Sequence, residues 1–512
     1  MMYKKTLHFI QKYSSIQNLS KKELWFLGAF IFVMKLLMVI AISFFDWKEG
    51  LSFYTNAGDD GQYIGYSENL YQTGEYYYDF GKSGVKDYFF RMPGMTLLYY
   101  PLRFIFNQTI TINLVVIIQV LLSTLSIFKF IELINKYFNV NNLLFLFFSV
   151  FYVYSAFLDA SLMTETLALS SLIFCIYYLD KSLSVDFKKK SLKYLFYSGF
   201  FLTWLIFLRP FMIPFLLLFL CYFLFRKRHV VYFITFLLPF LLIDGAWIYR
   251  NYKNHNEFVI LQKSLNWYDN GNKSLPAKIH FIKSFGFKWV NFEENSQSTW
   301  FNNQFEASSI KIPDNSIFPE RTFVGEMTID SLLKAREFMH KVVDKTLMTE
   351  ERIRADSEAS RILNKFVRTL KEENPFDYFF LNRVRLMMSF ISPNPHKLFI
   401  HGSYPMNIFI TWMDVFFNIL LKYIGLLGVI ILLISQVKKI NYLILFTSIP
   451  FYLLFLFPYV LRIDETRFFY LSLPFLILGL LILFSKFNNL TRILIFSSVF
   501  VLSLSFIIDL FY

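Results

Sequence analysis

Residues 24–45, LWFLGAFIFVMKLLMVIAISFF, form an apolar run with a single charge, Lys35, and it is long enough to cross a lipid bilayer as one helix. Five lysines precede it in residues 1–23, namely Lys4, Lys5, Lys12, Lys21 and Lys22. The run is longer than the core of a signal peptide and lacks a cleavage site made of small residues. We therefore interpret it as an uncleaved signal anchor.

The whole chain follows the same pattern. Hydrophobic residues make up 55% of its 512 positions and charged residues 17%, which is far too apolar for a soluble protein of this size. Further apolar runs of spanning length or close to it lie near 110–132, 141–159, 164–180, 193–208, 211–225, 229–248, 408–435, 441–460, 468–485 and 492–511. We predict an all-α polytopic membrane protein with about eleven transmembrane helices.

The distribution of Lys and Arg predicts the orientation of these spans. The net charge is +14, but the basic residues gather in short clusters between alternate apolar runs rather than on one face, which argues against nucleic-acid binding. The short loops on the opposite side hold only Arg209, Arg462 and Arg467. We expect a multi-pass protein of a bacterial inner membrane with a cytoplasmic N-terminus, so that segments 46–109 and 249–407 are extracytoplasmic, the latter periplasmic.

Composition divides the chain into three parts. Residues 1–248 form an N-terminal transmembrane module, 249–407 a charged and mostly helical extracytoplasmic domain, and 408–512 a C-terminal transmembrane module. Both cysteines, Cys175 and Cys221, fall within apolar runs, so no disulfide framework holds the polar segments.

The polar residues that carry chemistry gather on the extracytoplasmic side. In the first loop, residues 56–94 read NAGDDGQYIGYSENLYQTGEYYYDFGKSGVKDYFFRMPG. Other carboxylates and guanidiniums stand at the ends of later spans, and because each is costly wherever it faces lipid, we expect them to line one cavity at the membrane boundary. These residues are Asp159, Glu165, Arg209, Asp244, Arg250, Arg462, Asp464, Glu465 and Arg467.

Simpler interpretations exist for several of these residues. A single Arg at the end of a span is commonly an interfacial anchor. Asp59 and Asp60 are also suited to cap a helix that begins at Gly61. Lys35, in the middle of the first span, is expected to pair with a carboxylate of the bundle or to extend toward the membrane surface.

The first loop resembles a family signature. Gly58 to Tyr76 reads G-D-D-x-x-Y-I-x-x-x-E-N-L-x-x-T-G-E-Y and is followed by R-M-P-G at 91–94, which is similar to GT-C fold glycosyltransferases related to family 39. That family includes the protein O-mannosyltransferases and the bacterial lipid A aminoarabinose transferase. Three later segments agree in order: MTETLALSS at 163–171, W-x-x-R-N-Y at 247–252 with N-G-N at 270–272, and R-F-F-Y at 467–470 with Pro474. Segment 280–400 has no counterpart, and Asp59-Asp60 stands where many members have Asp-Glu.

The resemblance implies a GT-C-like bundle and a glycosyltransferase. Its donor would be a sugar linked to polyprenyl phosphate, and its acceptor an extracytoplasmic lipid, glycan or protein. The acceptor hydroxyl needs a base, for which we predict Asp59, with Asp60 positioning the helix or helping to hold a cation beside Glu165. We predict that the donor phosphate is bound by arginines and that three further residues support the site. The arginines are Arg91, Arg250, Arg462 and Arg467, and the supporting residues are Tyr63, Glu68 and Glu165. The need for a metal or other cofactor is left open.

Two other classes of protein compete with this interpretation. A polysaccharide polymerase or ligase would also use arginines in extracytoplasmic loops, with its main loop placed differently. A transporter or lipid flippase is expected to show repeated halves with matching Gly/Pro breaks. The sequence shows no such symmetry, and the long insertion 249–407 before the last spans argues against one.

Overall fold

The protein is almost entirely helical, as expected for a chain whose apolar segments must satisfy their backbone hydrogen bonds internally. The computed structural model describes residues 20–45, 53–54, 59–79, 86–185, 188–225, 230–263, 273–287, 296–301, 314–344, 346–392, 405–437, 443–461 and 466–511. Two strands of two residues each are the only β-structure in these ranges.

Seven helices in the described part are long and apolar enough to cross a membrane. They are formed by α2 (Lys21–Phe45), α5 (Gln108–Asn135), α8 (Glu165–Ser184), α9 (Lys188–Leu208), α11 (Val230–His255), α17 with η7 and α18 (Pro405–Ile419, Leu420–Gly425 and Leu426–Val437), and η9 with α21 (Thr466–Ser472 and Leu473–Lys486). The structure thus confirms a helical multi-pass membrane protein, whereas the predicted count of eleven spans is not confirmed.

The remaining predicted runs correspond to shorter or bent helices. The helices α6 (Asn142–Phe151) and α7 (Val153–Ala160) are bent by 57° relative to each other at Tyr152. They are long and apolar enough to cross a membrane only when they are taken together as one span. Three further apolar helical segments are shorter than the seven spans. These are η2 with α10 (Pro210–Met212 and Ile213–Phe225), α20 with η8 (Ile449–Leu454 and Phe455–Leu461), and α22 (Asn489–Phe511); the short α19 (Leu443–Thr447) precedes α20.

Two helices occupy the centre of the bundle. In both α8 and α21, 83% of the most apolar stretch of the helix is buried inside the protein, compared with 28% in α11 and 33% in α2. Helix α8 begins with Glu165, and α21 follows directly from the 3-10 helix η9, which carries Arg467. Polar residues at the ends of these two helices are therefore held by the best-packed part of the molecule.

The segment between α2 and α5 folds back on the end of the bundle. It contains α3 (Asp60–Thr73), the antiparallel strands β1 (Tyr78–Asp79) and β2 (Lys86–Asp87), and α4 (Thr96–Arg103). Gly74, with φ of 77°, ends α3 in the left-handed conformation that glycine adopts without strain.

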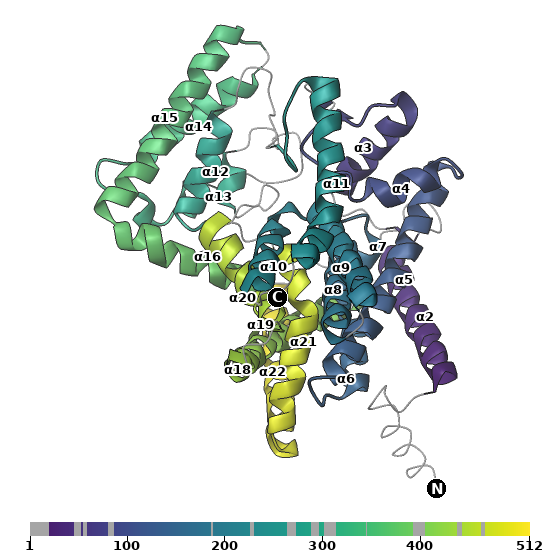
Figure 1. Cartoon of the computed structure of the whole chain (residues 1–512). Helices are drawn as coiled ribbons and strands as arrows, with labels where there is room; N and C mark the ends of the chain where they lie inside the picture. Colours follow the sequence, from purple (N-terminus) through teal and green to yellow (C-terminus); the bar gives the residue numbers. More distant parts are fainter. Residues whose placement is uncertain are drawn as a thin grey trace.

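A helical domain with its own core follows α11. It consists of α12 (Ser274–Ser284), α13 (Gln297–Trp300), η3 (Asn315–Ile317), η4 (Glu320–Thr322), α14 (Ile329–Val343), α15 (Thr349–Glu373), η5 (Asp377–Leu381) and α16 (Asn382–Ile391). Phe281 and Trp300 are fully buried in this core. Figure 1 shows α12 to α15 at the same end of the bundle as α3, with α16 at the junction between domain and bundle.

Candidate functional site

Asp59 lies at the position that would cap α3, but its side chain makes no capping hydrogen bond. It forms ion pairs instead, with Arg467 (Nη1 to Oδ2, 2.8 Å) and with Arg91 (Nη2 to Oδ2, 3.4 Å). Arg91 belongs to the same loop, whereas Arg467 comes from η9, some four hundred positions along the chain. The carboxylate is thus directed away from its helix and into a group of charges.

The two guanidiniums keep Asp59 ionised. Burial raises the pKa of Asp59, but the charges of Arg467, Arg91 and Arg209 and the hydrogen bond from Arg467 together outweigh burial, so the pKa lies below its ordinary value of 3.8. The carboxylate is 29% exposed. Asp59 is therefore a charged, accessible group at neutral pH.

Arg91 is fixed by the first turn of α3. Its Nε donates to Oε1 of Gln62 (2.9 Å) and its Nη1 donates to the hydroxyl of Tyr63 (3.1 Å). The guanidinium also lies over the Tyr63 ring, 4.7 Å from the centroid. Tyr63, predicted as a supporting residue, thus orients the guanidinium that pairs with Asp59.

Glu165 joins the same group of charges from the start of α8. It is buried and forms an ion pair with Arg209, while the Nε of Arg467 lies 4.0 Å from its Oε1. Both arginines face the ring of Phe468, at 5.4 and 5.2 Å. Arg467 therefore lies between two carboxylates. We call Asp59, Arg91, Glu165, Arg209 and Arg467 the Asp59 cluster.

Asp60 has a different environment from Asp59. Its side chain is buried, and its Oδ2 accepts the amide hydrogen of Leu162 (2.9 Å). The prediction of a helix that begins at Gly61 was wrong by one residue, because α3 begins at Asp60. Asp60 ties the start of α3 to the turn between α7 and α8, a contact that is compatible with the predicted positioning role.

A buried ion pair lies next to this turn. Lys35 of α2 pairs with Asp159 of α7 (Nζ to Oδ2, 2.8 Å) and donates to the hydroxyl of Ser123 (2.5 Å). Thr166 donates to the other oxygen of Asp159 (2.9 Å). The expected pairing of Lys35 with a carboxylate of the bundle is confirmed, and it fixes α2 and α7 beside the start of α8.

Glu68 belongs to a separate network. Its Oε1 accepts from the hydroxyl of Tyr99 (2.6 Å) and from the Nε of Arg103 (2.7 Å). Both partners lie on α4, so Glu68 holds α3 and α4 together. None of these contacts connects Glu68 to Asp59 in the described part of the chain, and its role is to shape the first loop.

The four predicted phosphate-binding arginines do not all converge. Arg91 and Arg467 meet at Asp59. Arg250 donates instead to the carbonyl oxygen of Tyr76 (2.9 Å), and none of its contacts within the described ranges reaches the Asp59 cluster. Arg462 lies outside the described residues. The third arginine of the Asp59 cluster is Arg209. The sequence reasoning placed Arg209 in the cavity but not among the phosphate ligands.

Gly94 docks the first loop onto the bundle. The indole nitrogen of Trp204 on α9 donates to the carbonyl oxygen of Gly94 (3.0 Å). A Cβ atom built on Gly94 would lie 2.6 Å from the carbonyl oxygen of Phe207, closer than atoms pack. The R-M-P-G segment therefore needs glycine at its last position so that Arg91 can reach Asp59.

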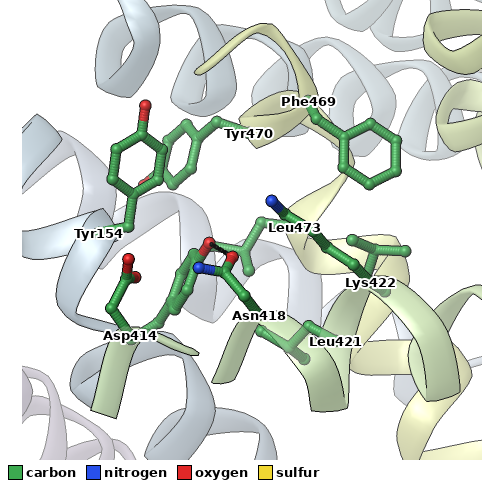
Figure 2. Close-up of a pocket in the computed structure, with 10 residues that line it drawn as sticks. Tyr154, Asp414, Asn418, Leu421, Lys422, Phe469, Tyr470 and Leu473 are labelled. Carbon is green, nitrogen blue, oxygen red and sulfur yellow. Dashed lines mark hydrogen bonds between the residues drawn. The ribbon is translucent and has the colours of Figure 1, made fainter. Parts of the chain in front are cut away.

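A second polar site lies beside η9, inside the bundle. This Lys422 cavity is lined by Tyr152, Tyr154, Asp414, Asn418, Leu421, Lys422, Phe469, Tyr470, Leu473 and Leu476. Figure 2 shows the Lys422 ammonium pointing into the space near Phe469 and Tyr470. Lys422 donates to the carbonyl oxygen of Ser392 (3.0 Å), and Tyr152 donates to Asn418 (2.9 Å).

Sequence reasoning did not single out this cavity. Asp414 and Lys422 are charges inside an apolar run, and this signal could have identified them. Tyr470 connects the two sites, because it lines the Lys422 cavity and lies one turn of η9 after Arg467. The arrangement places an accessible charged site and an enclosed polar one on a single short helix.

No group of three or more His, Cys, Asp or Glu side chains within the described ranges is arranged to hold a metal ion. Fold and site together define a helical multi-pass membrane protein with a charge cluster at the end of its bundle. Comparison of the chain with protein-family models, with curated proteins and with solved structures finds no match.

Proposed function

We propose that this protein is a glycosyltransferase that transfers a sugar from a polyprenyl-phosphate donor to an acceptor on the extracytoplasmic side of a bacterial inner membrane. The observation that carries the proposal is the ionised Asp59 held between Arg91 and Arg467. The segments that resemble family 39 enzymes, the first loop, the start of α8 and η9, each supply members of this cluster. A structural cap would not need that convergence.

In the proposed reaction Asp59 is the general base. The acceptor hydroxyl attacks the anomeric carbon, its proton passes to Asp59, and the bond between that carbon and the phosphate oxygen breaks. Polyprenyl phosphate leaves with one additional negative charge, and no general acid is needed because phosphate is a good leaving group. Base catalysis of this kind contributes about 10²–10⁴-fold.

The arginines suit this shift of charge. Before the reaction Arg91 and Arg467 neutralise Asp59. When Asp59 takes up the proton it loses its charge at the moment when the departing phosphate gains one. The same guanidiniums then stabilise the phosphate, with Arg209 adding positive charge beside Glu165. Asp60 and Tyr63 keep the geometry that the reaction requires.

The remaining features of the proposal concern topology. We propose eleven crossings, with the bent pair α6–α7 and the three shorter apolar segments each counted as one. The charge bias of the loops supports a cytoplasmic N-terminus, and with eleven crossings the helical domain would then be periplasmic. A reporter fused near Asp314 should be active only outside the cytoplasm, and cytoplasmic activity would contradict the orientation.

The function is tested by deleting the gene and comparing the envelope lipids, glycans and proteins by mass spectrometry. The deletion should remove the mass increment of one sugar from one class of envelope molecule. Wild-type protein should restore it, as should Glu75→Gln, which changes an exposed carboxylate of the same loop. Asp59→Asn, expressed to the same level, should not. An unchanged envelope, or full restoration by Asp59→Asn, would refute the proposal.

One observation favours a second function, the transport of a polar lipid or an ion. Asp414 and Lys422 are charged groups inside the bundle, as in many transport pathways. A transporter should lose activity on Asp414→Asn and keep it on Asp59→Asn. The proposed transferase should show the opposite order once the amounts of folded protein are matched.

A further inference from the structure

The helical segment from Phe376 to Ile391, formed mainly by η5 and α16, has apolar side chains on two opposite faces. One face is buried and contains Tyr378, Asn382, Leu386 and Phe390. The other face is exposed over Phe376 (64%), Phe379 (50%), Phe380 (49%), Val384 (36%) and Met388 (55%). We call these five residues the exposed stripe. An exposed helix face made of apolar side chains is poorly suited to water.

The π-helical turn of η5 adds to the exposed stripe. Because a π-turn contains one more residue than an α-turn, the two neighbours Phe379 and Phe380 both point outward. The rings of Phe376 and Phe380 stack with centroids 5.3 Å apart. The result is a continuous aromatic surface rather than scattered apolar side chains, and such surfaces mark interaction sites.

The buried face places this segment at the level of the bundle. Phe390 packs against Phe457 of η8 and Phe469 of η9, at centroid distances of 5.9 and 5.4 Å. Lys422 of η7 donates to the carbonyl oxygen of Ser392, the residue after α16. The helix therefore ends among the apolar helices, although it begins in the helical domain.

The exposed stripe adjoins a surface of the same kind. η8 packs along α16, and its own Phe455 and Val460 are exposed, as are side chains on the lipid-facing sides of the spans. Lys371, which is exposed, lies over the Phe379 ring (5.9 Å), whereas Arg383 is buried toward the bundle, 6.0 Å from the ring of Tyr459 on η8. Basic and aromatic side chains in this combination are typical of the lipid headgroup region.

We propose that η5 and α16 form a membrane-docking helix. The exposed stripe lies in the lipid leaflet on the side of the helical domain, and the phosphate headgroups of that leaflet are the partners of the exposed Lys371. The lipid bilayer, rather than another protein, covers this surface. Docking holds the helical domain at a fixed height above the end of the bundle that carries the Asp59 cluster.

The test measures whether lipid or water surrounds the stripe. In full-length protein with Cys221→Ser, so that the exposed native thiol is removed, Phe380→Cys and Met388→Cys are separately labelled with a nitroxide. The proteins are placed in nanodiscs of phosphatidylethanolamine and phosphatidylglycerol at 3:1. Accessibility to oxygen, which concentrates in lipid, and to a water-soluble nickel chelate is then measured by power-saturation spectroscopy.

Two matched positions calibrate the readout. Leu242→Cys on α11 lies on an exposed apolar face of a candidate span, and Arg368→Cys on α15 lies on the exposed surface of the helical domain. Labels at 380 and 388 should be accessible to oxygen and shielded from nickel, as at 242. Labels that behave as at 368, with nickel access at both stripe positions, would overturn the proposal and leave the surface to a protein or glycan partner. Use of two stripe positions keeps the test valid if one variant fails to fold.

Discussion

The Asp59 cluster and the Lys422 cavity are connected by η9, which contributes Arg467 to one and Tyr470 to the other, yet they differ in access to solvent. Asp59 is 29% exposed and has two guanidiniums within 3.4 Å. Lys422 is 5% exposed, and its charged neighbour is Asp414. An accessible, paired carboxylate can exchange its proton during a reaction, whereas charges sealed inside a bundle mainly affect folding. The contrast predicts that mutations in the first site change activity and those in the second change stability.

The largest effect is expected from Asp59→Asn. The substitution keeps size and hydrogen bonding but removes basicity, so transfer should fall by about 10²–10⁴-fold while the unfolding temperature changes little. Asp60→Asn should reduce activity clearly less, because an amide oxygen can still accept the hydrogen of Leu162. Rates measured with a purified lipid-linked donor decide between them. If Asp60→Asn abolished transfer while Asp59→Asn retained it, the two roles would be reversed.

Arg467→Gln should come next. Loss of the guanidinium nearest Asp59 should lower transfer by about 10²–10³-fold, as for other groups that stabilise developing charge. It should also raise the pKa of Asp59, because Arg467 is the strongest of the charges that lower it. Asp59 must be unprotonated to act, so the acid side of the pH–rate profile should move to higher pH. Arg250→Gln is the control and should leave the profile in place, since Arg250 contacts the carbonyl of Tyr76 instead.

Substitutions in the Lys422 cavity should lower the stability of the protein. Asp414→Ala leaves a buried ammonium without its neighbouring carboxylate, and Lys422→Met leaves the carboxylate without the ammonium. Each should lower the free energy of unfolding by on the order of 3 kcal/mol. The double variant should lose less than the sum of the two, and a thermal unfolding series in nanodiscs measures this coupling. Additive losses would show that the two charges do not interact.

A buried lysine of the helical domain, Lys278, extends the comparison to a site outside the bundle. Its effect on stability is expected to be the smallest of those predicted. Burial in the helical domain lowers the pKa of Lys278 on α12 from 10.5 to about 7. Between these values the unfolded chain binds a proton that the folded protein does not, so stability should rise with pH. The slope is at most about 1.4 kcal/mol per pH unit. Thermal unfolding at pH 7.5 and 9.5 should show this rise relative to Lys278→Met, and identical pH dependence in both proteins would contradict it.

The sequence predicted features that depend on local pattern and on the cost of burying charge. It indicated the helical membrane fold, the pairing of Lys35 with a carboxylate, and that Asp59 and Asp60 point in different directions. The contacts between helices could not be predicted from the sequence, because they depend on how the spans pack. Arg250 turns toward Tyr76, and Lys422 lies on the π-helical turn η7, where the regular α-helical spacing from Asp414 is interrupted. Likewise, the apolar stripe of α16 lay in a segment that looked like part of a soluble domain.

The close packing of Gly94 against α9 also limits how the first loop can vary in length among related chains. One end of the strand pair β1–β2 follows α3, which Asp60 ties to the bundle, and the other end leads to Gly94, which is fixed against α9. Insertions or deletions between the two strands would then change the length of the connection between them and would not shift Asp59 relative to Arg91. Length variation should therefore concentrate there, while the spacing from Arg91 to Gly94 stays constant.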